Sequence, residues 1–213
     1  MKNAILVLLG CWILANPDTI LAQQSPQVMI QAAMTECHAG RITQDRAIRI
    51  GHFEKGQVLG EQAVALDDRS AAAHFALFCN LGELMRVDGE LNITSVMGFR
   101  RMTKELDRTL ELAPDHLDAL SAKGTFLVRL PFLLGGDKQK GEKLLQYVLL
   151  KAPQSVNARL SLAKSYCADG RHSEALSLAS EALDLAQAQR QDDFAPEAEK
   201  VLAQLRANTA KAN

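Results

Sequence analysis

Apolar residues recur along most of the chain every three to four positions, with polar residues between them. Near the C-terminus, for example, one helical face carries Ala198, Val201, Leu202 and Leu205, while charged and amide residues take the opposite side. The strict alternation of apolar and polar residues that is typical of strands is nearly absent. The pattern therefore predicts an all-α protein.

Residues 155–186 show the clearest pattern, in which small and large apolar residues form two helical stripes. The stripes consist of Ala158, Leu162, Ala163 and Tyr166, and of Ala175, Ala179 and Ala182. Gly170 lies between the stripes and favours the backbone conformation that ends a helix. Because small residues let two antiparallel helices approach closely, we expect a helical hairpin here.

This spacing resembles the tetratricopeptide repeat (TPR), a helix–turn–helix unit of about 34 residues. The same register fits upstream, so we expect one TPR-like helical repeat domain over residues 23–213. The expected repeats lie at approximately 27–68, 70–115, 117–154 and 155–188, and a capping helix follows at 196–207. The expected fold is thus a TPR-like α-solenoid of about four helical hairpins plus a C-terminal capping helix.

Two segments depart from the regular repeat spacing. Pro131 should interrupt the helix within an extension over residues 129–135, and residues 86–98 form a longer insertion between two helices. Both segments follow the first helix of a hairpin, so we expect them to project at the same edge of the array. Irregular segments on a rigid scaffold often carry binding residues, which makes this edge a candidate site.

The first 22 residues have the organisation of a secretory signal peptide. Lys2 precedes an apolar run over residues 4–15, which is shorter than the roughly 20 residues that span a bilayer. We expect cleavage after Ala22 and a periplasmic or secreted protein. Lipoprotein processing at Cys11 is the alternative, and lipidation there would attach the protein to a membrane.

Cleavage after residue 22 leaves three cysteines, Cys37, Cys79 and Cys167, so at least one is unpaired. Each lies in a helical and mostly apolar pattern, which is typical of a buried free thiol. A Cys37–Cys79 disulfide is the other interpretation, since an exported protein meets oxidising conditions. The sequence leaves both interpretations open.

Charge and motifs exclude several classes of function. The chain has 24 Lys and Arg against 25 Asp and Glu, so no net positive field attracts nucleic acid. Phosphate-binding loops and the serine-nucleophile motif are absent from the sequence. The histidines and cysteines do not have metal-ligand spacings. We therefore predict no enzymatic activity, no metal, no cofactor and no nucleic-acid partner.

The concave face formed by the first helices of the repeats is the remaining candidate for binding. In the repeat register this face carries five candidate binding residues, namely Phe75, Ser121, Arg129, Asn157 and Lys164. Asn157 and Lys164 weakly resemble the TPR clamp for a C-terminal carboxylate, but Phe75 is apolar where that clamp needs a polar group. This mixed surface suits a peptide segment or a partner domain, with Arg129 as the expected polar anchor.

The residues around the extension carry a narrower resemblance. Pro131 followed by Gly135, Gly136 and Asp137 resembles a turn in the T-component family of tripartite ATP-independent periplasmic (TRAP) transporters, and the resemblance covers about residues 51–184. It implies an exported interaction module that serves as an accessory component of a solute transport system. The implied partner is a protein or peptide, such as a periplasmic solute-binding protein.

A small-molecule carrier is the alternative function, with its ligand in a cavity between the helical hairpins and the insertion at residues 86–98. The shape of the site separates the two functions. A closed apolar pocket lined by Phe75 and residues 130–134 would favour the carrier, whereas an open groove would favour the interaction module.

Overall fold

The structure is a computed structural model that describes residues 25–88 and 93–212. Its helices are α2 (Pro26–Ile42), α3 (Arg46–Leu66), α4 (Ala71–Asp88), α5 (Ile93–Leu112), α6 (Leu117–Arg129), α7 (Lys138–Lys151), α8 (Val156–Ala168), α9 (His172–Ala188) and α10 (Ala195–Ala212), with a short 3₁₀ helix η1 (Phe132–Leu134). All regular structure in this described part is helical, so the all-α prediction is confirmed. The expected signal peptide, residues 1–22, and Cys11 lie outside the described residues.

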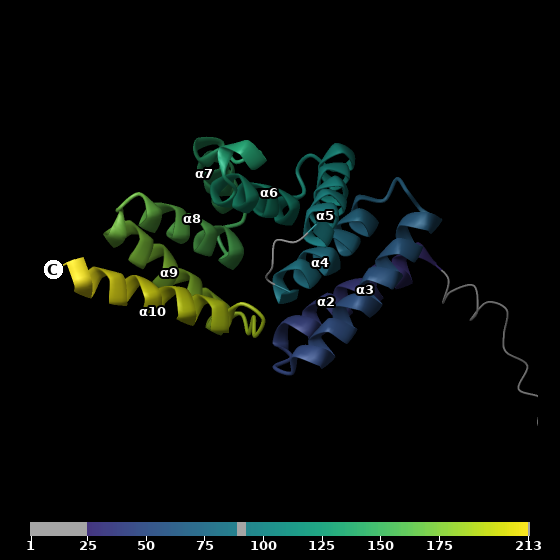
Figure 1. Cartoon of the computed structure of the whole chain (residues 1–213), viewed down its shortest axis with the longest axis horizontal. Helices are drawn as coiled ribbons and strands as arrows, with labels where there is room; N and C mark the ends of the chain where they lie inside the picture. Colours follow the sequence, from purple (N-terminus) through teal and green to yellow (C-terminus); the bar gives the residue numbers. More distant parts are fainter. Residues whose placement is uncertain (1–24, 89–92, 213) are drawn as a thin grey trace, which may run out of the picture.

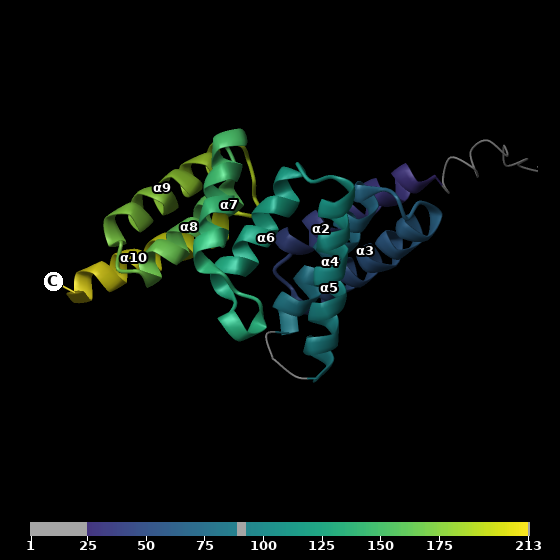
Figure 2. The same ribbon diagram turned by 90° about the horizontal axis from the view of Figure 1, so that it is seen from above.

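The helices form four consecutive hairpins, α2–α3, α4–α5, α6–α7 and α8–α9, and α10 packs against α9. Figure 1 shows that these hairpins follow an arc, so that the two ends of the array, α2 and α10, come close to each other. Figure 2, seen from above, shows the hairpins stacked side by side along the length of the molecule. First helices also pack in sequence, α2 against α4 and α6 against α8. They form the inner face of the arc.

Side-chain caps fix where several of the helices begin. The Asp45 and Asp137 carboxylates accept hydrogen bonds from the backbone N–H groups of Ile48 and Lys140, at 2.9 and 3.0 Å. Ser155 caps α8 in the same way. These caps satisfy N–H groups that have no partner within the helix, so the local sequence sets each helix start.

Two glycines end or redirect helices where the backbone enters the left-handed region. Gly170 follows α8 with φ of 74°, and Gly135 follows η1 with φ of 88°. An L-residue with a Cβ is strained at such angles, whereas glycine is not. The expected bend at Pro131 is also present, because α6 ends at Arg129 and η1 begins directly after the proline.

The expected insertion over residues 86–98 is wrong for the described part of that segment. Helix α4 continues to Asp88 and α5 begins at Ile93, so most of these residues are helical. Most of the residues that exceed the plain repeat spacing therefore lengthen the two helices. Residues 89–92 lie outside the described residues.

Small residues lie buried at the helix crossings, as the repeat register predicts. Ala158, Ala163, Ala175, Ala179 and Ala182 have no exposed surface. They pack α8 against α9, and Val201, Leu202 and Leu205 of α10 complete this C-terminal core. The close contact of α8 and α9 thus follows from the absence of large side chains between them.

The Cys37–Cys79 disulfide is formed, and it joins α2 to α4 with a Cα–Cα distance of 6.3 Å. Cys167, the third cysteine, is free and half-buried. Of the two interpretations that the sequence leaves open for Cys37 and Cys79, the structure therefore has the disulfide.

Candidate functional site

A cavity of about 530 Å³ lies on the inner face of the arc. Helices α4, α6 and α8 supply most of its lining, while α2, α5 and the beginning of α10 each contribute one or two side chains. The volume is within the range of about 300–1,000 Å³ that is typical of ligand sites. The cavity is therefore the candidate functional site.

All five candidate binding residues from the sequence line this cavity. Phe75 comes from α4, Ser121 and Arg129 from α6, and Asn157 and Lys164 from α8. Three first helices of successive repeats thus bring together residues that are up to 89 positions apart in the sequence. Of the extension, Leu130 also lines the cavity, whereas the side chains of Phe132 and Leu133 are 86% and 92% exposed and lie outside it.

One wall of the cavity is aromatic and comes from three helices. The ring centroids of Phe78 and Phe126 are 6.1 Å apart, and those of Phe99 and Phe126 are 6.0 Å apart, both in edge-to-face geometry. Phe75 is adjacent, 5.7 Å from Phe78. Such rings stabilise one another and offer a rigid apolar surface to a ligand.

A row of small polar side chains crosses the floor from α6 to α8. The Asn157 side-chain amide donates a hydrogen bond of 2.8 Å to Ser121 Oγ. One turn further along, the hydroxyls of Thr125 and Ser161 are 2.7 Å apart. These bonds satisfy the polar groups and fix the relative register of the two helices at the site.

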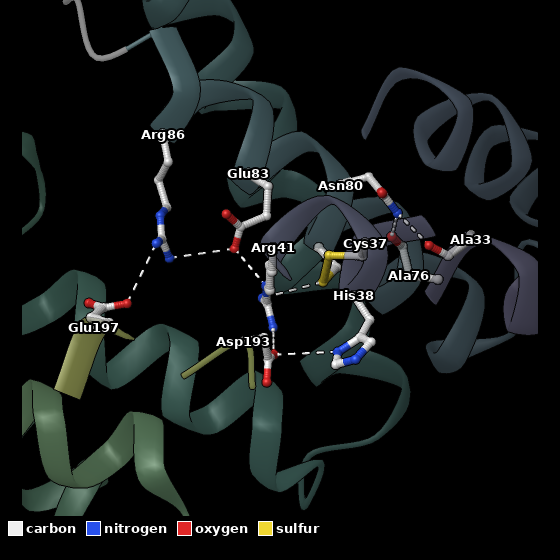
Figure 3. Close-up of polar contacts among 11 residues, drawn as sticks. Ala33, Cys37, His38, Arg41, Ala76, Asn80, Glu83, Arg86, Asp193 and Glu197 are labelled. Atoms are coloured by element: carbon white, nitrogen blue, oxygen red, sulfur yellow. Dashed lines mark hydrogen bonds and ion pairs between the residues drawn. A yellow bond between two sulfur atoms is a disulfide. The ribbon is translucent and has the colours of Figure 1, made fainter. Parts of the chain in front are cut away.

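Charged side chains join the two ends of the arc beside the cavity (Figure 3). Arg41 of α2 donates from Nε to Glu83 at 2.8 Å and lies 3.3 Å from Asp193, which precedes α10. The Arg41 guanidinium also lies 5.4 Å from the Phe194 ring centroid. Arg41 therefore links α2 to α4 and to the connection between α9 and α10.

Glu197, in the first turn of α10, lies near positively charged side chains from three other helices. Its carboxylate lies 2.6 Å from Lys164 Nζ and 3.5 Å from the guanidinium of Arg86. Burial raises the pKa of the Glu197 carboxyl. The positive charges of Lys164, Arg86 and Arg129 lower it by a larger amount, so the pKa lies below its ordinary value. The carboxylate is thus held in its charged form beside the cavity.

Sequence reasoning missed Arg41, Glu83, Arg86 and Glu197, which are as much part of the site as the five expected residues. The sequence pattern places Arg86 in the insertion and Glu197 on the polar side of the closing helix. The repeat register identifies residues of the inner face, but it does not show how far the arc closes. Only that closure brings Glu197 of α10 within 3.5 Å of Arg86 of α4.

Other polar clusters in the described part of the chain are structural. Buried His74 contacts Glu105 at 2.6 Å, from Nδ1 to Oε2, and the Asp68 carbonyl at 3.0 Å, which ties α4 to its neighbours. Residues 25–88 and 93–212 contain no cluster of three His, Cys, Asp or Glu side chains that could hold a metal ion. Within the same residues, every helix is too short or too polar to cross a membrane.

Comparison with known proteins gives structural neighbours only. No protein-family model and no curated protein matches the chain. The crystal structure of TTC0263, a thermophilic TPR protein of Thermus thermophilus, has a TM-score of 0.60 at 20% identity and covers 87% of each chain.

Two MamA structures are more distant, with TM-scores of 0.45. The RS-1 double mutant is 16% identical and covers 82% of this chain and 96% of its own. The protein from Desulfovibrio magneticus RS-1 is 17% identical and covers 84% and 96%. The similarity to the Thermus protein establishes the fold, and the prediction of a TPR-like α-solenoid is confirmed.

Proposed function

We propose that the protein is an exported TPR-like interaction module that holds a segment of a protein partner in the inner cavity. The cavity itself carries this proposal, because it combines an aromatic wall, a polar floor and charged groups on one side. Such a mixed surface is what a peptide segment with both apolar and charged side chains requires. We propose a binding role and no catalytic step for this site.

The carrier function receives less support from the shape of the site. The exposed side chains of Phe132 and Leu133 leave the extension outside the cavity, so residues 130–134 do not enclose an apolar pocket with Phe75. Polar and charged side chains also make up much of the lining. These features support the module over the carrier.

Export and the transport role rest on the sequence. Lys2 and the apolar run over residues 4–15 support secretion to the periplasm or beyond. The turn from Pro131 to Asp137 supports the proposed likeness to the T-component family of TRAP transporters, and hence a periplasmic solute-binding protein as partner. Intact-mass measurement of the protein from its host tests export: a chain that starts at Gln23 supports it, and a lipid-modified Cys11 would indicate a membrane-attached form.

Affinity capture tests the interaction. The tagged protein is incubated with periplasmic extract, and the retained protein is identified by mass spectrometry. We expect Arg129→Glu to abolish its retention, because the substitution reverses a charge at the cavity, and Arg206→Glu to leave it unchanged. Arg206 is the matched control, since it is exposed on α10 and lines no part of the cavity. Equal retention by both variants, with helicity preserved, would contradict the proposal.

A further inference from the structure

Glu197 has an unusual position for a residue of a closing helix, because it reaches into the lining of the cavity. Its two carboxylate oxygens contact cations from two other helices, Lys164 at 2.6 Å and Arg86 at 3.5 Å. Arg129 adds a third positive charge that acts on the same carboxylate. Three cations from α4, α6 and α8 therefore converge on one acidic group that the chain itself supplies.

The described residues provide ion-pair partners for only some of these cations. Arg129 is exposed and makes no hydrogen bond or ion pair among the described residues. Asp118, the other acidic residue on the α6 side of the cavity, is in the first turn of that helix. Eleven residues along α6 separate the two side chains by about 16 Å, so Asp118 does not neutralise Arg129. The Arg129 end of the cavity can accept a further negative charge.

Helix α10 does not depend on the Glu197 ion pairs for its position. Its buried face, Ala198, Val201, Leu202 and Leu205, packs into the C-terminal core without Glu197. The Glu197 side chain is also 30% exposed, so its carboxylate has access to water. The carboxylate can therefore leave Lys164 and Arg86 by a change of rotamer while α10 stays in place.

We propose that the Glu197 carboxylate occupies the position that a carboxylate of the bound partner would take. The cavity then binds a partner segment that carries an apolar side chain beside a carboxylate. The apolar side chain packs on the aromatic wall around Phe126. The carboxylate of the segment displaces Glu197 from Lys164 and Arg86 and pairs with Arg129 as well. This inference rests on the proposed function and adds to it the chemistry of the bound segment. It also makes Glu197 a competitor that sets the affinity of the site.

Two small fluorescent probes test the displacement on the full-length protein. 1-Anilinonaphthalene-8-sulfonate (ANS) combines aromatic rings with a negative charge, and N-phenyl-1-naphthylamine has similar rings without the charge. We expect Glu197→Gln to tighten ANS binding by about threefold to tenfold, because Lys164 loses its carboxylate partner and Arg86 keeps only Glu83. The uncharged probe should bind both proteins equally. Glu199→Gln, an exposed position two residues along α10, is the matched control and should leave ANS binding unchanged.

A double-mutant cycle places the effect at this site. Lys164→Met should weaken ANS binding. In a Lys164→Met background, the increase in ANS affinity caused by Glu197→Gln should fall to less than about half of its value in the natural protein, since the effects of substitutions at contacting residues are not additive. Arg129→Gln provides the same test without touching an existing ion pair. Circular dichroism and thermal melting of each variant confirm that the helices are retained.

The outcomes separate this inference from the proposed function. Unchanged ANS affinity in Glu197→Gln, an equal gain for the uncharged probe, or no ANS binding by any variant would overturn the role of Glu197. If partner capture still depends on Arg129 in that case, the interaction module stands and only the ligand chemistry is wrong. Tighter ANS binding that depends on Lys164, together with stronger partner capture by Glu197→Gln, supports the inference.

Discussion

The two ends of the array share helix crossings lined by buried alanines and differ in the contacts that are added to this packing. In the C-terminal block, α8 to α10, alanines with no exposed surface line the crossings and large apolar residues fill the rest. In the N-terminal block, α2 to α4, a disulfide joins α2 to α4. The buried Asn80 amide also donates to the Ala33 and Ala76 carbonyls, at 3.0 and 2.9 Å (Figure 3).

This difference shows which packing is visible in a sequence. Alanine stripes recur at helical spacing and identify a TPR-like hairpin without any knowledge of its neighbours. The N-terminal block also has alanines with no exposed surface, Ala33, Ala63, Ala73 and Ala76, but it adds individual long-range contacts between specific residues of two helices. We therefore expect substitutions in the N-terminal block to act through single contacts, and those in the C-terminal block through packing volume.

Removal of the disulfide is expected to have the largest effect. The double variant Cys37→Ala and Cys79→Ala should lower the free energy of unfolding by about 2–4 kcal/mol, because the bridge closes a long loop in the unfolded chain. Urea denaturation measures the loss, and hydrogen exchange should show faster opening of α2 to α4 than of α8 to α10. Cys167→Ala is the control; equal acceleration in both blocks would mean that the blocks do not differ in this way.

Overpacking tests the C-terminal block. Ala175→Leu inserts a large side chain at a position with no exposed surface between α8 and α9, which should cost about 1–3 kcal/mol. The change is measured as a lower midpoint in thermal and urea melts. Ser173→Leu, two residues earlier on α9 and outside the buried stripe, should have little effect. An unchanged midpoint for Ala175→Leu would show that the hairpin tolerates a wider separation of its helices.

A pair of glycines on α3 provides a sharper test of single contacts in the N-terminal block. A Cβ at Gly60 would meet the Leu77 Cα at 2.8 Å, so Gly60→Ala should lower the free energy of unfolding by about 1–2 kcal/mol. A Cβ at Gly51 meets nothing within 4 Å, so Gly51→Ala should raise it by about 0.5–1 kcal/mol through helix propensity. Denaturant melts of both variants compare the two signs, and the same sign for both would refute the close approach of α3 and α4.

The smallest expected effect concerns the contact between the two ends at Glu197. The folded-state pKa of this carboxyl lies below its ordinary value, so its ion pairs contribute stability above about pH 4.5 and lose it as pH falls through the folded pKa. At pH 6, Glu197→Gln should cost less than about 1 kcal/mol, and the difference from the natural protein should be smaller at pH 3. Urea unfolding at both values, with Glu199→Gln alongside, measures it. A constant difference would exclude titration of Glu197 as its origin.

The candidate site is partly predictable from the repeat register. Because helical side chains repeat every 3.6 residues, the register assigns Ser121, Arg129, Asn157 and Lys164 to the inner face, and all four line the cavity. Glu197 cannot be found in this way, since an acidic residue in a first helical turn is usual on electrostatic grounds alone. The prediction of an insertion over residues 86–98 is wrong for the described part of the segment, because a departure from the repeat spacing does not show whether extra residues form a loop or lengthen the helices, and here α4 and α5 are longer.

The sequence by itself determined the helices, their order and the small-residue crossings. These depend on short-range geometry: caps such as Ser155 bond to N–H groups three residues away, and Gly170 adopts angles that other residues avoid. The tertiary structure alone decided the pairing of Cys37 with Cys79, the convergence of three cations on Glu197, and the closure of the arc around the cavity. The reason is that the curvature of a solenoid is the sum of small rotations between successive repeats, and the sequence pattern within one repeat does not determine that sum.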